Sequence, residues 1–207
     1  PISYERLQSY ANQFIAHWRE LSRQIGPEMA DILATASDEQ IAELVQNIDK
    51  RNKKFKTNYV DIPLESLAEK RKERLTKDIK QWISRLTAEQ KQAVSAWSDQ
   101  ITPLAADGLR YRQRVLTEFQ NLLTKQRQAP DFKEAFVALL VNFDQMRTRE
   151  YQQKIDINTD LTLKLLIKID RSLNATQRTY LLKRIGSMAS DFDKLSCDPV
   201  QITPSVQ

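Results

Sequence analysis

The chain has 207 residues with 41% hydrophobic and 29% charged side chains, seven prolines, three glycines, one histidine and one cysteine. Its net charge of +5 comes from 32 basic residues interleaved with 27 acidic ones, which favours solubility and lacks the concentrated basic face of a nucleic-acid-binding protein. So few glycines, histidines and cysteines exclude glycine-rich phosphate loops, most turn-dense all-β folds, the usual zinc sites and histidine-based catalytic triads, unless a triad uses His17.

Apolar residues recur at helical spacing along nearly the whole chain, which predicts a series of amphipathic helices. The first is expected from Ser3 to Ile25, ending at Gly26-Pro27, because glycine commonly follows a last helical turn and proline commonly starts a helix. Further breaks containing proline are predicted at residues 61–63, 102–103 and 129–130. We therefore predict an all-α fold, an elongated bundle of about eight or nine helices.

Residues 161–169 alternate apolar and polar side chains in the manner of a β-strand. No second segment offers a pairing partner, and an isolated strand is not stable. We predict instead a central helix that is apolar on more than one side. Residues 1–197 are expected to form a single helical domain, and the proline-containing residues 198–207 a disordered tail.

Three predicted helix starts, at residues 37–40, 87–90 and 174–177, share a capping pattern. In each, a Ser, Thr or Asn is followed three residues later by Gln. The first side chain can accept a hydrogen bond from the backbone of the third residue on, while the Gln side chain reaches back to the cap. Each cap contributes about 1 kcal/mol, which is enough to fix where a helix begins.

The Leu-Thr-x-x-Gln element at residues 86–90 is similar to the motifs of Spy-like periplasmic chaperones. Most of the chain more closely resembles an uncharacterised family of lipoproteins, a domain of unknown function from Gram-negative bacteria. The central block of that family resembles residues 71–97, with Arg71-Lys72-Glu73-Arg74, Trp82 and Trp97. Its arginine-rich helix and its last Gln motif resemble residues 109–114 (LRYRQR) and 173–178 (LNATQR).

This resemblance implies an exported protein in the periplasm, lipid-anchored to the outer membrane. Any membrane attachment would come through an anchor that these 207 residues do not include, since no stretch approaches the ~20 apolar residues of a membrane-spanning helix. Because the chain opens at Pro1 without a methionine, we expect a processed terminus from which a targeting segment has been removed.

The function expected from the resemblance and the amphipathic helices is non-enzymatic binding of an envelope protein or an unfolded polypeptide. Basic runs at residues 50–56 and 70–74 are either solvated helix faces or a patch that attracts anionic partners. Interleaved arginines at 110–114 form either surface salt bridges or an anion clamp. The candidate partner-binding residues are Lys53, Lys54, Phe55, Arg110, Arg112 and Arg114.

Two alternatives remain open from the sequence. The chain could be an architectural envelope lipoprotein that does not bind clients, or a cell-wall hydrolase using two carboxylates held in one cleft. No catalytic residue, metal ligand or cofactor is assigned, since the resembling family supplies none. The sequence gives no indication of the oligomeric state.

Overall fold

The computed structural model describes residues 2–197, and within them it confirms an all-α fold of eight α-helices without strands. The tail expected at residues 198–207 lies outside this range. No helix in the described range is long and apolar enough to cross a membrane. The helices are α1 (Tyr4–Thr35), α2 (Asp38–Tyr59), α3 (Leu64–Ile83), α4 (Ala88–Gln100), α5 (Ala105–Asn121), α6 (Phe132–Val141), α7 (Arg149–Arg171) and α8 (Ala175–Cys197).

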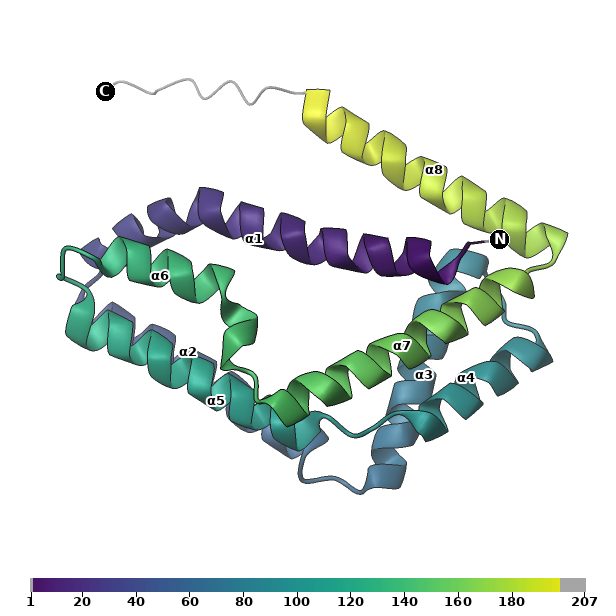
Figure 1. Cartoon of the computed structure of the whole chain (residues 1–207), viewed down its shortest axis with the longest axis horizontal. Coiled ribbons are helices and arrows are strands. Elements are labelled where there is room, and N and C mark those ends of the chain that lie inside the picture. Colours follow the sequence, from purple (N-terminus) through teal and green to yellow (C-terminus); the bar gives the residue numbers. More distant parts are fainter. Residues whose placement is uncertain (1, 198–207) are drawn as a thin grey trace.

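The helices pack in two groups, each around its own buried cluster (Figure 1). In one group α1 packs on α6 and α2 on α5; in the other, α3 and α7 pack on α4, and the start of α8 packs on α3. A π-helical turn, Leu122–Gln126, extends α5, and a 3-10 turn, Phe143–Met146, leads into α7. The long helix α1 also contacts α7, so it links the two groups.

The break predicted at Gly26-Pro27 is wrong, because α1 continues through both residues to Thr35. Ser22, Gly26 and Ala30 are the buried residues of α1, four positions apart on one face. A Cβ atom built on Gly26 would lie 2.9 Å from Cγ2 of Val137 on α6. The absence of a side chain at Gly26 therefore allows α1 and α6 to approach closely. The packing of this face of α1 against α6 keeps the helix continuous despite Pro27, which removes a backbone hydrogen bond.

The ambiguous segment at residues 161–169 is helical, as predicted, and lies within α7. Its alternating apolar residues, Leu163, Leu165, Ile167 and Ile169, are all buried. Burial at successive odd positions covers more than one side of a helix, so α7 is enclosed along this stretch. The pattern that imitates a strand thus reflects a helix with neighbours on several faces.

All three predicted capping patterns form. Ser37 and Thr87 make complete capping boxes with Gln40 and Gln90, and the Asn174 and Gln177 side chains exchange the same two bonds with each other's backbone N–H groups. Beyond its own box, Gln90 also meets Gln177: each side-chain amide donates to the other's oxygen, at 3.1 and 2.9 Å. The pair joins the starts of α4 and α8 inside the protein.

Candidate functional site

A groove of about 700 Å³ runs between α2 and α5 and is closed at one side by Tyr151 of α7. It arises because the apolar faces of both helices carry large side chains that their packing does not fully cover. Its lining is Ile48, Asn52, Phe55, Tyr59, Leu104, Ala105, Gly108, Tyr111, Arg112, Val115, Leu116, Phe119 and Tyr151.

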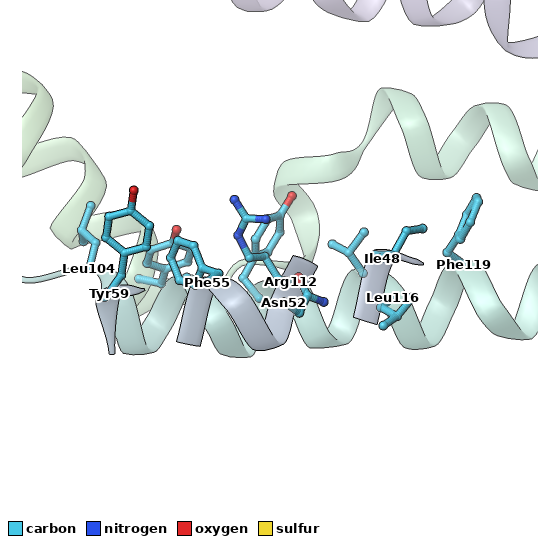
Figure 2. A pocket seen from close by; sticks show the side chains of 13 residues that line it. Ile48, Asn52, Phe55, Tyr59, Leu104, Arg112, Leu116 and Phe119 are labelled. Carbon is cyan, nitrogen blue, oxygen red and sulfur yellow. The ribbon is translucent and has the colours of Figure 1, made fainter. Parts of the chain in front are cut away.

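Only two lining residues carry strongly polar side chains, Asn52 and Arg112. In Figure 2 they lie between the aromatic rings of Phe55 and Tyr59 on one side and Ile48 and Phe119 on the other. Asn52 is only 5% exposed, and its Nδ2 has no hydrogen-bond partner among the described residues. A buried donor left without a partner costs about 1–3 kcal/mol. Because the Asn52 Nδ2 is covered in this conformation, it would meet an acceptor in the groove only after a shift of its side chain or of the lining.

Arg112 lies over the face of Phe55, with 4.5 Å between its Cζ and the ring centroid. The Phe55 ring in turn contacts Tyr59, at 5.1 Å between centroids. A cation over an aromatic face is held by the charge distribution of the ring. This contact fixes a positive charge at the edge of an otherwise apolar surface.

Tyr111 and Tyr151 form a second aromatic pair in the groove, 6.0 Å apart. The Tyr111 hydroxyl donates to the carbonyl oxygen of Phe143 at 2.7 Å. Burial raises the pKa of Tyr111 above its ordinary value, so the hydroxyl remains protonated and keeps this bond. The ring is thereby held in one orientation against α7.

Gly108 is buried on the groove side of α5 and does not interrupt the helix. A Cβ at this position would lie 3.3 Å from the Tyr151 hydroxyl and 3.8 Å from Cζ of Phe55. The missing side chain leaves room for the two rings to approach α5. The helix begins at Ala105, just after Thr102-Pro103, and runs through Gly108 without a break.

The groove continues toward α3 in a second cavity of about 410 Å³, which shares Tyr59, Leu104 and Ala105 with the first. The basic side chains of Lys70, Arg71 and Arg74 line this part together with the acidic Asp78, which pairs with Arg74. Arg71 is held by α4, because its Nη2 donates to the carbonyl oxygen of Ser98 at 2.7 Å. The basic run near residue 70 therefore borders an apolar surface.

The structure brings two of the six candidate binding residues together, Phe55 and Arg112. The other four lie outside the groove lining. Lys53 is exposed and pairs with Asp49 at 2.8 Å, and Lys54 is exposed. Arg110 forms an ion pair with Asp107, and Arg114 donates to the carbonyl oxygen of Met146 at 3.2 Å.

The prediction missed Asn52, which is the most distinctive residue of the groove. A signal was present, because Ile48, Asn52, Phe55 and Tyr59 follow one another at helical spacing. A lone amide within an apolar stripe is a buried polar group that needs a partner. Tyr151 could not have been found this way, since it reaches the groove from a distant part of the chain.

Among the described residues, those that line the main cavity include no carboxylate, histidine, cysteine, serine or threonine, and the continuation adds one carboxylate, Asp78. His17 lies on an exposed stretch of α1, away from this lining. Within the described residues, no three metal-ligating side chains gather in one place. The side chains in the groove can bind apolar groups, donate hydrogen bonds and attract anions.

Comparison with known proteins places the chain in the family of unknown function DUF6279, which matches residues 1–152. The match covers α1 to α6 and the start of α7, and so includes every residue of the groove. It confirms the resemblance to an uncharacterised family, whereas no comparison shows similarity to lipoproteins or to Spy-like chaperones. No curated protein and no solved structure matches the chain.

Proposed function

We propose that this chain is a non-enzymatic binding domain that takes an apolar segment of another protein into the groove between α2 and α5. The observation that supports this most is Asn52, whose buried amide has no partner among the described residues and lines an apolar groove. A bound polypeptide supplies backbone carbonyl oxygens, which are the acceptors that this amide lacks.

The charges around the groove favour a segment that also carries acidic residues. Arg112 lines the main cavity, and Lys70, Arg71 and Arg74 line its continuation. Opposite charges at the edge of an interface mainly raise the association rate and orient the partner. Apolar side chains of the segment would fill the cavity, while its carboxylates would face the basic edge.

The composition of the lining favours binding over acid–base chemistry. A glycosidase-type mechanism requires two carboxylates facing one cleft. Among the described residues, the main cavity has none and its continuation has one, Asp78. The proposal therefore assigns the groove a partner and no substrate.

The proposed setting is the periplasmic side of the outer membrane, where a lipid-anchored protein would meet envelope proteins or unfolded exported polypeptides. This part of the proposal rests on the resemblance of the block at residues 71–97 and of the two later motifs. Fractionation of cells that produce the protein in its native host tests it, with recovery in the outer-membrane fraction as the expected result.

The experiment that tests binding measures suppression of aggregation. A chemically denatured client is diluted with and without the protein at two salt concentrations, and light scattering is followed. We expect suppression at near-stoichiometric ratios, weaker at high salt because salt screens the basic edge. Arg112→Glu should reduce suppression strongly, whereas Lys54→Glu, with the same charge change outside the lining, should have little effect.

Absence of suppression at any ratio, or equal loss in the two variants, would show that the groove does not take up clients. The architectural role would then be the better explanation. Circular dichroism of both variants controls for the fold.

A further inference from the structure

Residues 8–18 of α1 are all exposed, although an isolated helix of this length is marginal in water. The helix is tied down on both sides of this stretch. At one end the Tyr4 hydroxyl donates to Oδ1 of Asp160 on α7 at 2.9 Å, and at the other Ser22, Gly26 and Ala30 are buried against α6. Between these points α1 bridges the two helix groups (Figure 1).

This bridging helix carries an apolar stripe, which we name the α1 stripe: Phe14, Trp18, Leu21 and Ile25. Their side chains are 69%, 46%, 46% and 42% exposed. The spacing of four, three and four residues places them on one side of the helix. Ser22, Gly26 and Ala30, which face α6, lie on a different side, so α6 leaves the α1 stripe uncovered.

A second stripe with the same spacing lies on α8, and we name Leu181, Ile185, Met188 and Phe192 the α8 stripe. Leu181 packs against the buried cluster around α3 and α7. The next three side chains are 49%, 38% and 64% exposed. Among the described side chains of α8, the buried contacts lie at its start, at Gln177 and Leu181, and beyond them the helix diverges from α1 (Figure 1).

We propose that two copies of this chain associate by packing the α1 stripe of each copy against the α8 stripe of the other. Alternating steps of three and four residues are the spacing with which helices interlock in coiled coils and helical bundles. A two-fold axis would form both contacts at once, and each would cover an apolar face that the single chain leaves in water.

The charges beside the stripes permit this pairing. The heptad positions that flank the α1 stripe, which include His17 and Gln24, hold no Lys, Arg, Asp or Glu. The corresponding positions on α8, Arg184 and Asp191, have opposite signs. No register of the two helices therefore sets like charges against each other. The mixed signs also argue against an anionic membrane surface, which favours a predominantly basic face.

The exposed apolar area matches the requirement of a stable dimer. Large apolar side chains that are about half exposed present on the order of 100 Å² each. Each copy offers eight such side chains: the four of the α1 stripe, the three exposed members of the α8 stripe, and Leu182, which is 62% exposed beside that stripe. That is on the order of 800 Å² per copy, close to the ~800 Å² per partner of a standard specific interface.

Sedimentation velocity at micromolar concentration tests the proposal. We expect the chain to sediment at twice its mass of 24.1 kDa. Leu21→Glu and Ile185→Glu should each weaken dimerisation at least about tenfold, since a charge would be buried in the interface. The matched controls Asn12→Glu and Ser190→Glu, exposed positions away from the stripes, should remain dimeric, and circular dichroism checks that all four variants fold.

Cross-linking between differently tagged chains tests whether the α1 stripe of one copy contacts the α8 stripe of the other. In a Cys197→Ser background, one chain carries Leu21→Cys and the other Ile185→Cys, and a flexible bis-maleimide should join the two tags. A monomeric wild type, or a dimer unaffected by Ile185→Glu, would overturn the proposal. So would cross-linking only within one chain of a double-cysteine variant, which would show α8 folding back onto its own α1. Arg112→Glu, which should weaken binding in the groove, should leave the sedimenting mass of the dimer unchanged. Loss of binding in the groove and loss of dimerisation are therefore distinguishable.

Discussion

Replacing Gly26 by alanine adds one methyl group where α1 packs against Val137 of α6. On an unobstructed helix this change stabilises by about 1 kcal/mol, because alanine has the higher helix propensity. At Gly26 the new Cβ would lie 2.9 Å from Cγ2 of Val137, and the short β-branched side chain of valine has little freedom to move away. Overpacking of this kind costs about 1–3 kcal/mol, so we expect Gly26→Ala to destabilise by on the order of 1 kcal/mol.

The assay is thermal unfolding followed by circular dichroism, in which about 1 kcal/mol corresponds to roughly 2–4 °C for a chain of this size. Val137→Ala removes the obstructing methyl groups, so Gly26→Ala should cost less in that background, as a double-mutant cycle would show. Gly186→Ala is the matched control, since nothing lies within 4 Å of its added Cβ, and it should not lower Tm. A rise in Tm on Gly26→Ala would refute the close packing of α1 on α6.

Two further predictions concern the joints between helices. Gln90→Leu should lower the free energy of unfolding by about 2 kcal/mol, because it removes the Gln90 half of the capping box and the bonds to Gln177. Gln177→Leu should cost less in this variant than in the wild type, as measured by urea denaturation. Asp107 receives a 2.7 Å hydrogen bond from Lys154, which does most to lower its pKa. The bond to Lys154 therefore stabilises the fold at pH values above the unfolded-state pKa of Asp107. This stabilisation is lost as the pH falls through the lower pKa that Asp107 has in the folded state. Asp107→Asn should reduce this acid-dependent loss in unfolding measured from neutral to acid pH, and an unchanged acid dependence would contradict the assignment.

The features that were predicted correctly from the sequence are local ones. A capping box depends on two side chains three residues apart, so Thr87 and Gln90 are enough to place the start of α4. The helix at residues 161–169 was predicted correctly for a different reason, namely that no segment could pair with it as a strand.

The features that were missed depend on contacts between distant residues. Gly26-Pro27 has the local chemistry of a helix end, but packing against Val137 decides the outcome. Gln90 was expected to act within its own box, and its contact with Gln177 joins residues 87 positions apart. Within the groove, the basic run at residues 50–56 and the arginines at 110–114 suggested Phe55 and Arg112. Tyr151 comes from α7, and no local pattern indicates that it lies beside them.

The most direct test of binding in the groove replaces Asn52 by leucine, a residue of similar size without polar atoms. Removing a buried donor that lacks a partner should stabilise the free protein by on the order of 1 kcal/mol. The same change removes the donor for a bound carbonyl oxygen, so affinity should fall by about tenfold. Fluorescence anisotropy with a labelled peptide of leucine, phenylalanine and acidic residues measures the affinity, and thermal unfolding measures the stability. A higher Tm with weaker binding is the predicted result; a higher Tm with unchanged affinity would contradict binding in the groove.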